Sequence, residues 1–148
     1  MLNNKTIAVV VPAYNESKQI KMVLETIPDF VDRIIVVDDC SKDDTTNIVK
    51  EYFDNNISNI SIPSILKDDV VLNAYNKADI EIRERAKKEI DFFMPSEDVN
   101  HDEENERIIL IQHKKNGGVG AARATGYKWC KDHNICLLYT SDAADESV

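Results

Sequence analysis

The fold of this chain is constrained most by three short apolar runs. Each run is followed by a polar loop and then by a segment whose apolar residues recur with the spacing of a helix. The runs are TIAVVV (6–11), RIIVV (33–37) and RIILIQ (107–112). Apolar runs without polar alternation are typical of strands buried on both faces of a sheet. Strands that alternate with helices favour a parallel sheet with right-handed crossovers. The sequence therefore predicts an α/β fold of order βαβαβα with a mostly parallel sheet.

The segments after the runs carry the expected helices. Apolar residues recur every three or four positions from Ile20 to Ile27, and Ser17 is placed to cap this helix. Asp43 or Asp44 is placed to cap the second helix. The third helix is rich in small residues and is expected to end at about Lys131.

The loops that leave the strands are the expected binding region. In open parallel sheets, ligands collect outside the carboxyl ends of the strands. Three loops meet this condition: Pro12–Glu16, Asp38–Asp43 and His113–Gly120.

The first loop combines an aromatic ring with a carboxylate. The Tyr14 ring could stack on a nucleobase, and the Glu16 carboxylate could accept hydrogen bonds from ribose hydroxyls. The alternative is an ordinary strand–turn–helix connection, with Glu16 favoured by the helix dipole.

The second loop begins with two adjacent carboxylates, Asp38 and Asp39. Neighbouring negative charges repel, and neither residue is needed as a helix cap. Such acids at a ligand-bearing edge accept hydrogen bonds from a nucleotide or approach its metal ion. We therefore interpret this pair as functional.

Within the third loop, the segment Asn116–Gly120 offers backbone N–H groups at a helix start, and Arg123 follows one turn later. Together these groups suit an anion such as a diphosphate. The alternative is that the small residues let the helix pack closely on the sheet. The loop is not a P-loop, and no GxGxxG follows the first strand, which argues against an NAD-dependent enzyme.

The charge is concentrated in one segment. The 148 residues include 18 Lys and Arg and 27 Asp and Glu, a net charge of −9. Residues 54–106 hold 14 acidic and 6 basic residues, and we interpret this segment as an acidic insertion with a helix over about 77–93. Pro95–Asn105 is expected to be a solvated loop or disordered link. The acidic balance argues against nucleic acid as a partner.

The remaining composition indicates a cytoplasmic protein. No apolar run approaches the roughly 20 residues of a membrane span, and no signal peptide precedes the first strand. The three cysteines form no CxxC pair, which argues against a disulfide framework. His101 has no His or Cys nearby and is not expected to bind metal.

Taken together, the three loops resemble the nucleotide-sugar-binding half of family 2 glycosyltransferases, which have the GT-A fold. The matching segments are VVVPAYNE (9–16), IIVVDDCSKDDT (34–45) and KNGGVGAARATGY (115–127). They occur in the family's order, each after an expected strand. Cys40 stands where the family commonly has glycine or asparagine.

The resemblance implies inverting transfer of a sugar from a nucleoside diphosphate to a hydroxyl or polyprenyl-phosphate acceptor, with the full-length protein working at the inner face of the membrane. A nucleotide-binding module without catalysis is the alternative. The resemblance implies nucleotide-binding roles for Pro12, Ala13, Tyr14, Glu16, Asp38, Asp39, Gly118, Gly120 and Arg123.

The resemblance also implies Mg²⁺ or Mn²⁺, held in this family by a DxD motif on the next strand, and a catalytic base further downstream. Neither is found: Asp142 and Asp145 are wrongly spaced for DxD, and no catalytic or metal residue is assigned. CLLYTSDAADE (136–146) resembles one reading frame of a sequencing adapter. We therefore interpret 1–135 as a partial glycosyltransferase domain, inactive by itself, and 136–148 as a non-native tail. The alternative for the tail is a genuine short strand, LLYT (137–140), with a frayed acidic end.

Overall fold

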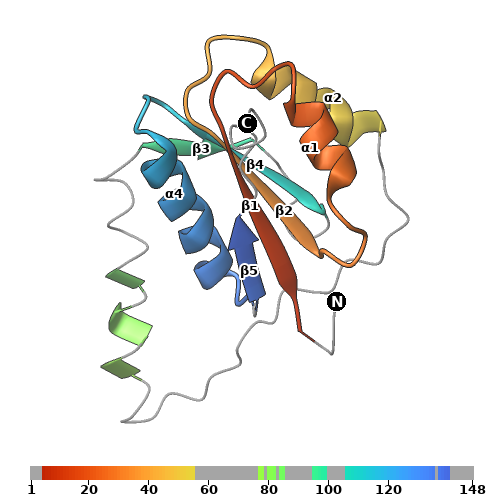
Figure 1. The fold of residues 1–148 in the computed structure, drawn as a ribbon. Helices are drawn as coiled ribbons and strands as arrows, with labels where there is room; N and C mark the ends of the chain where they lie inside the picture. Colours follow the sequence, from red (N-terminus) through yellow and green to blue (C-terminus); the bar gives the residue numbers. More distant parts are fainter. Residues whose placement is uncertain are drawn as a thin grey trace.

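The computed structural model describes residues 5–55, 77–78, 80–82, 84–85, 95–99, 106–135 and 137–140. Strands and helices alternate along most of the chain (Figure 1), which confirms the predicted α/β class. The elements are β1 (Ile7–Ala13), α1 (Ile20–Thr26), β2 (Arg33–Asp38), α2 (Thr45–Asn55), β3 (Ser96–Asp98), β4 (Ile108–His113), α4 (Val119–Asp132) and β5 (Leu137–Thr140).

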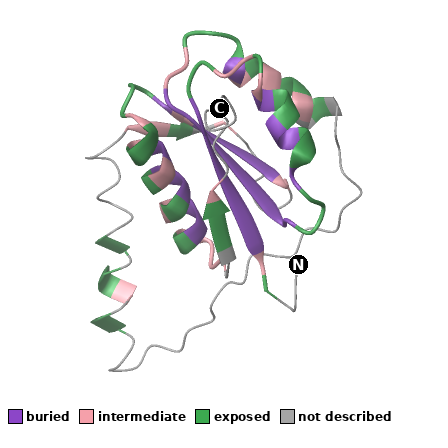
Figure 2. Cartoon of the chain, in the orientation of Figure 1, coloured by how far each residue is buried: buried purple, intermediate pink, exposed green. Residues whose placement is uncertain are grey.

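The strands form one five-stranded sheet in the order β3-β4-β2-β1-β5. The pairs β4–β2, β2–β1 and β1–β5 are parallel, and β3 is antiparallel to β4 at one edge. The mostly parallel sheet is therefore as predicted. β1 and β2 are buried along their whole length, and Figure 2 shows them between helices whose outer sides are exposed.

Helices cover both faces of the sheet, with α4 on one side and α1 and α2 on the other (Figure 1). The two faces of β2 follow the strand's alternation. Ile34 and Val36 join the apolar cluster that contains α1, whereas Ile35 and Val37 join the cluster that contains α4. Burial on both faces explains why the strand sequences are continuous apolar runs.

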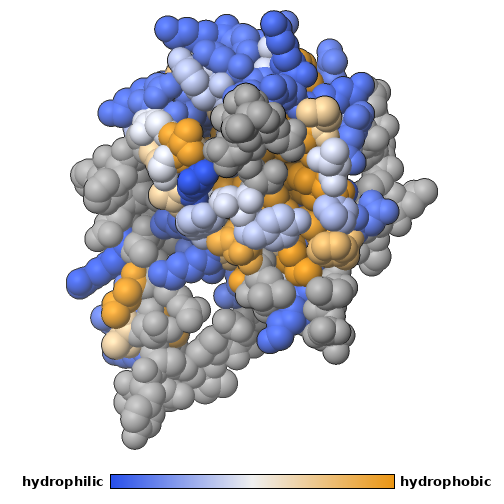
Figure 3. Space-filling view, viewed as in Figure 1, coloured by the Kyte–Doolittle hydropathy of each residue, from blue (hydrophilic) through white to orange (hydrophobic). Residues whose placement is uncertain are grey.

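The strand register brings the predicted loops together. Ala13 of β1 is paired with Asp38 of β2, and Asp38 is paired with Gln112 of β4. The three loops therefore leave the sheet from one row. The upper end of the molecule in Figure 3, above this row, is mainly hydrophilic.

Several local expectations were wrong. The first strand extends beyond the predicted run 6–11, because Pro12 lies inside β1 and is paired with Val37. Ser17 does not cap α1, which begins after Gln19 without a side-chain cap. Ser96–Asp98, expected in a loop, forms β3, because β4 has a free edge with which an extended segment can pair.

The insertion and the tail are described only in part. Residues 77–78, 80–82 and 84–85 are helical, as predicted, and the rest of the expected helix lies outside the described residues. Leu137–Thr140 forms β5 beside β1, and 141–148 lie outside the described residues. The non-native origin of 136–148 stays a prediction. Within the part of the chain that is described, no helix is long and apolar enough to cross a membrane.

Candidate functional site

Asp38 and Asp39 point to opposite faces of the sheet. Asp38 continues the alternation of Ile34 and Val36, and its Oδ2 accepts a hydrogen bond from the Ser41 N–H at 3.2 Å. Its Oδ1 is buried and has no hydrogen-bond partner among the described residues. Asp39 lies on the α4 face. The expected repulsion between neighbouring carboxylates is thus reduced by strand alternation, which the sequence argument overlooked.

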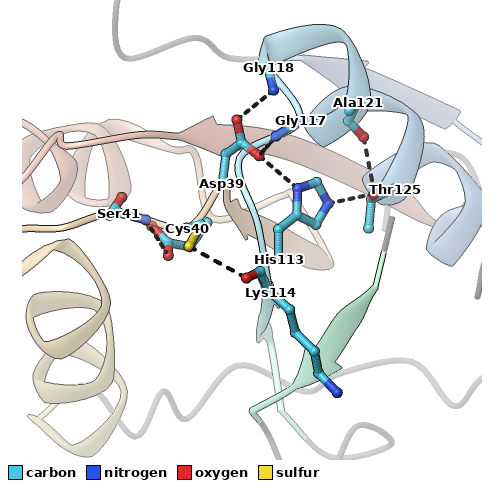
Figure 4. Close-up of polar contacts among 10 residues, drawn as sticks. Asp39, Cys40, Ser41, His113, Lys114, Gly117, Gly118, Ala121 and Thr125 are labelled. Atoms are coloured by element: carbon cyan, nitrogen blue, oxygen red, sulfur yellow. Dashed lines mark hydrogen bonds and ion pairs between the residues drawn. The ribbon is translucent and has the colours of Figure 1, made fainter. Parts of the chain in front are cut away.

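The Asp39 carboxylate is the centre of the site (Figure 4). It is 3% exposed and accepts three hydrogen bonds. Oδ1 accepts from the Gly117 N–H at 2.8 Å and from His113 Nδ1 at 2.9 Å, and Oδ2 accepts from the Gly118 N–H at 2.8 Å. Two of the backbone N–H groups that were expected to be exposed for an anion are therefore bound to a carboxylate of the protein itself.

His113 connects this carboxylate to α4. Its side chain is 0% exposed, and its Nε2 lies 2.7 Å from Thr125 Oγ1. Thr125 Oγ1 also lies 3.0 Å from the carbonyl oxygen of Ala121, one turn earlier in α4. The chain Asp39–His113–Thr125 thus joins β2, β4 and α4 through polar groups inside the protein.

The first and second loops are also joined to each other. The N–H groups of three consecutive residues at the end of the first loop and just after it donate to side chains of the second loop and of Thr45, the first residue of α2. One bond runs in the reverse direction. These bonds are Asn15 N–H to Ser41 Oγ (2.9 Å), Glu16 N–H to Thr45 Oγ1 (3.0 Å), Ser17 N–H to Asp43 Oδ2 (3.2 Å) and Lys42 N–H to Asn15 Oδ1 (2.8 Å).

Asp43 combines this bridge with a helix cap. Its Oδ1 accepts from the backbone N–H of Thr45 at 3.1 Å and from the Thr45 hydroxyl, which confirms Asp43 as a capping residue. Desolvation raises the pKa of the carboxyl, but hydrogen bonds from Thr45 and Ser17 lower it, and the net result is a lowered pKa. The charged form is therefore favoured.

One residue in each of the three loops, Asn15, Cys40 and Gly118, has positive φ. Cys40 has φ of +60°, a conformation that glycine and asparagine adopt more readily, which accounts for the residues common at this position in the resembling family. Gly118, at the N-cap of α4, has φ of 89° and ψ of 169°, a region essentially restricted to glycine.

The predicted site residues lie around this edge but differ in access. Pro12, Ala13, Asp38 and Asp39 are buried; Glu16, Gly118 and Arg123 are half-buried; Tyr14 and Gly120 are exposed. Tyr14, at 39% exposure, is the aromatic ring that a ligand could reach. Sequence reasoning missed His113, Thr125 and the bridging role of Asp43. Of these three residues, only His113 could have been singled out from the sequence, because it lies at the end of a predicted strand.

The described residues do not fit a divalent metal. They contain no group of three or more His, Cys, Asp or Glu placed to hold one. Asp38 and Asp39 diverge, and Asp43 is bound to Ser17 and Thr45. No step is therefore assigned to a metal ion.

Known proteins share the first two loops. The sequence model of the family described as Glycosyl transferase family 2 matches residues 8–65, which include all of β1 except Ile7, all of β2 and the loops that follow these strands. Residues 8–65 are therefore similar to part of a family 2 glycosyltransferase domain. The match supports the resemblance for the motifs 9–16 and 34–45, whereas the motif 115–127 lies outside the matched residues.

One relative of this chain is the UDP-N-acetylglucosamine--dolichyl-phosphate N-acetylglucosaminyltransferase of Methanococcus voltae. It is 49% identical over 49 residues, which are 32% of this chain and 20% of the relative. The chain thus spans a fifth of that relative. Two crystal structures of S. aureus TarS are 20% identical and cover 93% of this chain, with TM-scores of 0.49 and 0.48 and 27% and 16% of the TarS chains covered.

Proposed function

We propose that the carboxyl edge of this sheet binds a nucleoside-diphosphate sugar as the donor for a glycosyl transfer. The observation that carries the proposal is the joining of the three loops: Asp39 of the second loop holds the third, and Ser41 and Lys42 hold the first. The first two loops lie within the family match. Such joined loops give a ligand a preorganised surface, which lowers the entropic cost of binding. Exposed Tyr14 at the rim supplies a ring on which a nucleobase can stack.

The relative from Methanococcus voltae suggests UDP-N-acetylglucosamine as the donor to test first and dolichyl phosphate as the first acceptor. In the proposed inverting reaction, an acceptor oxygen attacks the anomeric carbon while the bond to the diphosphate oxygen breaks. The nucleoside diphosphate leaves with the electron pair. A lipid-linked acceptor would place the whole protein at the inner face of the membrane.

We also propose that this chain binds the donor without transferring the sugar. The sequence contains no DxD triplet, and no described residue is assigned as the base for the acceptor. The expected result is no transfer from labelled UDP-N-acetylglucosamine to dolichyl phosphate, with or without Mn²⁺. Measurable transfer by the chain would contradict this part of the proposal.

Calorimetry with UDP, GDP and NAD, each with and without Mn²⁺, tests donor binding. Binding of UDP or GDP supports the proposal, whereas binding of NAD alone refutes it. A non-catalytic nucleotide-binding module would also bind UDP or GDP. Restoring a longer glycosyltransferase gene product and assaying transfer separates this alternative from an enzyme.

Tyr14→Ala tests the location of the site. Tyr14 is 39% exposed, so its removal should weaken nucleotide binding about tenfold through lost stacking and leave stability nearly unchanged. Tyr127→Ala is the matched control, because Tyr127 is 41% exposed and lies in the middle of α4. Equal effects of the two variants on binding would place the site elsewhere.

A further inference from the structure

We propose that His113 is a positioning residue, which holds the Gly117–Gly118 segment in its binding geometry by orienting Asp39. This inference rests on the proposed function, because it concerns the same edge of the sheet. Asp39 can accept from both glycine N–H groups only while its carboxylate group keeps one orientation about the Cβ–Cγ bond. The bond from His113 Nδ1 to Oδ1, at 2.9 Å, restricts rotation away from this orientation, because it holds the same oxygen that accepts from the Gly117 N–H.

The hydrogen bonds determine which ring nitrogen carries hydrogen. The Asp39 carboxylate has no hydrogen to donate, and its Oδ1 already accepts one from the Gly117 N–H. In the bond between Oδ1 and His113, the hydrogen is therefore on Nδ1. Nε2 is then free to accept from the Thr125 hydroxyl at 2.7 Å. Thr125 has one hydroxyl hydrogen. Donating it to His113 leaves the ring neutral, whereas donating it to the Ala121 carbonyl requires a second ring N–H and a charged imidazolium.

Both arrangements keep the bond between His113 and Asp39. Thr125 therefore holds the ring plane, and the ring holds the carboxylate. The ring itself is buried behind Asp39 and does not face solvent, so it acts on a ligand through Asp39 and the loop. Its removal should change the order of the loop more than it changes the apolar core.

Two substitutions separate the two ring nitrogens. In His113→Asn the amide group lies near the position of Nδ1 and can still donate to Asp39. In His113→Gln the amide lies near the position of Nε2, where it can bond Thr125 but not Asp39. Both variants lose the ring, so each controls for the packing defect of the other.

The first readout is hydrogen exchange at the Gly117 and Gly118 amides of the full chain, which needs no ligand. We expect exchange in His113→Gln to be at least about tenfold faster than in His113→Asn, since a lost hydrogen bond changes a local equilibrium by about this factor. UDP affinity should fall in the same order. Equal exchange rates in the two variants overturn the proposal.

Nitrogen-15 NMR of His113 in the wild-type protein supplies a test that does not depend on either variant folding. Hydrogen on Nδ1 is expected, and hydrogen on Nε2 alone overturns the proposal. If the wild-type protein binds no nucleotide but the exchange rates differ as expected, the proposed function fails and the positioning role stands.

Discussion

Gly126 of α4 packs directly against Val10 of β1. A Cβ atom placed on Gly126 would lie 2.3 Å from Val10 Cγ1 and 2.9 Å from Cγ2. No Cβ atom is accommodated at such distances, so the absence of a side chain sets how closely α4 approaches the sheet. Because α4 begins at the third loop, this approach also sets the height of that loop above the strand ends.

Replacing Gly126 with Ala should destabilise the protein by about 2 kcal/mol, because the added methyl group forces Val10 or the helix to move. Gly120→Ala is the control, since a Cβ there meets nothing within 4 Å. The control should be neutral or stabilising by about 0.5 kcal/mol through helix propensity. Urea unfolding measures both, and equal destabilisation would contradict the packing argument.

Cys40→Gly should stabilise the protein by about 0.5–1 kcal/mol. The φ of +60° at Cys40 strains a residue with a side chain, and relief of this strain exceeds the added entropy of glycine in the unfolded chain. Cys40→Val should have the opposite effect, because β-branched residues tolerate this conformation least. Thermal unfolding of the two variants gives the comparison, and a more stable Val variant would sink the explanation.

Gly118→Ala should destabilise the protein by about 2 kcal/mol even though the space around this glycine is open. The cause is the backbone conformation at φ of 89° and ψ of 169°. UDP binding should weaken as well, since the Gly118 N–H is one of the donors to Asp39. A stability loss no larger than in Gly120→Ala would argue against this conformation.

Asp43 should make the free energy of unfolding depend on pH under acidic conditions. Its pKa is lower in the folded protein than its usual value of 3.8. In the interval between the two values the unfolded chain binds more protons, so stability rises with pH there. The contribution of Asp43 is complete above pH 3.8 and is lost as pH falls through the lower folded value.

Asp43→Asn should therefore flatten the pH dependence of unfolding below about pH 4. The effect is modest, because Asp43 is exposed and solvent screens its charge. Asp44→Asn is the matched control, since the Asp44 carboxylate accepts from Asn47 within its own helix region rather than from the first loop. Identical acid profiles for the two variants would remove Asp43 as the cause.

The strands and helices that flank the site could be predicted from the sequence. A strand buried on both faces is a continuous apolar run, and a helix with one buried face has apolar residues every three or four positions. The edge strand β3 could not be predicted. Its residues are Ser96, Glu97 and Asp98, which have low strand propensity, and only pairing with β4 makes them extended.

The site was predicted at the level of loops but not of individual bonds. The sequence placed Asp39 and Gly118 at the same edge, since both follow parallel strands. It did not show that they bind each other, because the hydrogen bond joins residues 79 positions apart. His113 was passed over for the same reason, as its partners Asp39 and Thr125 belong to other elements.

The bonds to Asp39 also determine when the site forms during folding. They join residues 74 to 79 positions apart, across the whole acidic insertion. The entropy of closing so long a loop must be overcome before these bonds can form, whereas the contacts between β1, α1 and β2 close much shorter loops. We therefore expect the β1–β2 half to assemble first and the bonds to Asp39 to form only when β4 docks beside it.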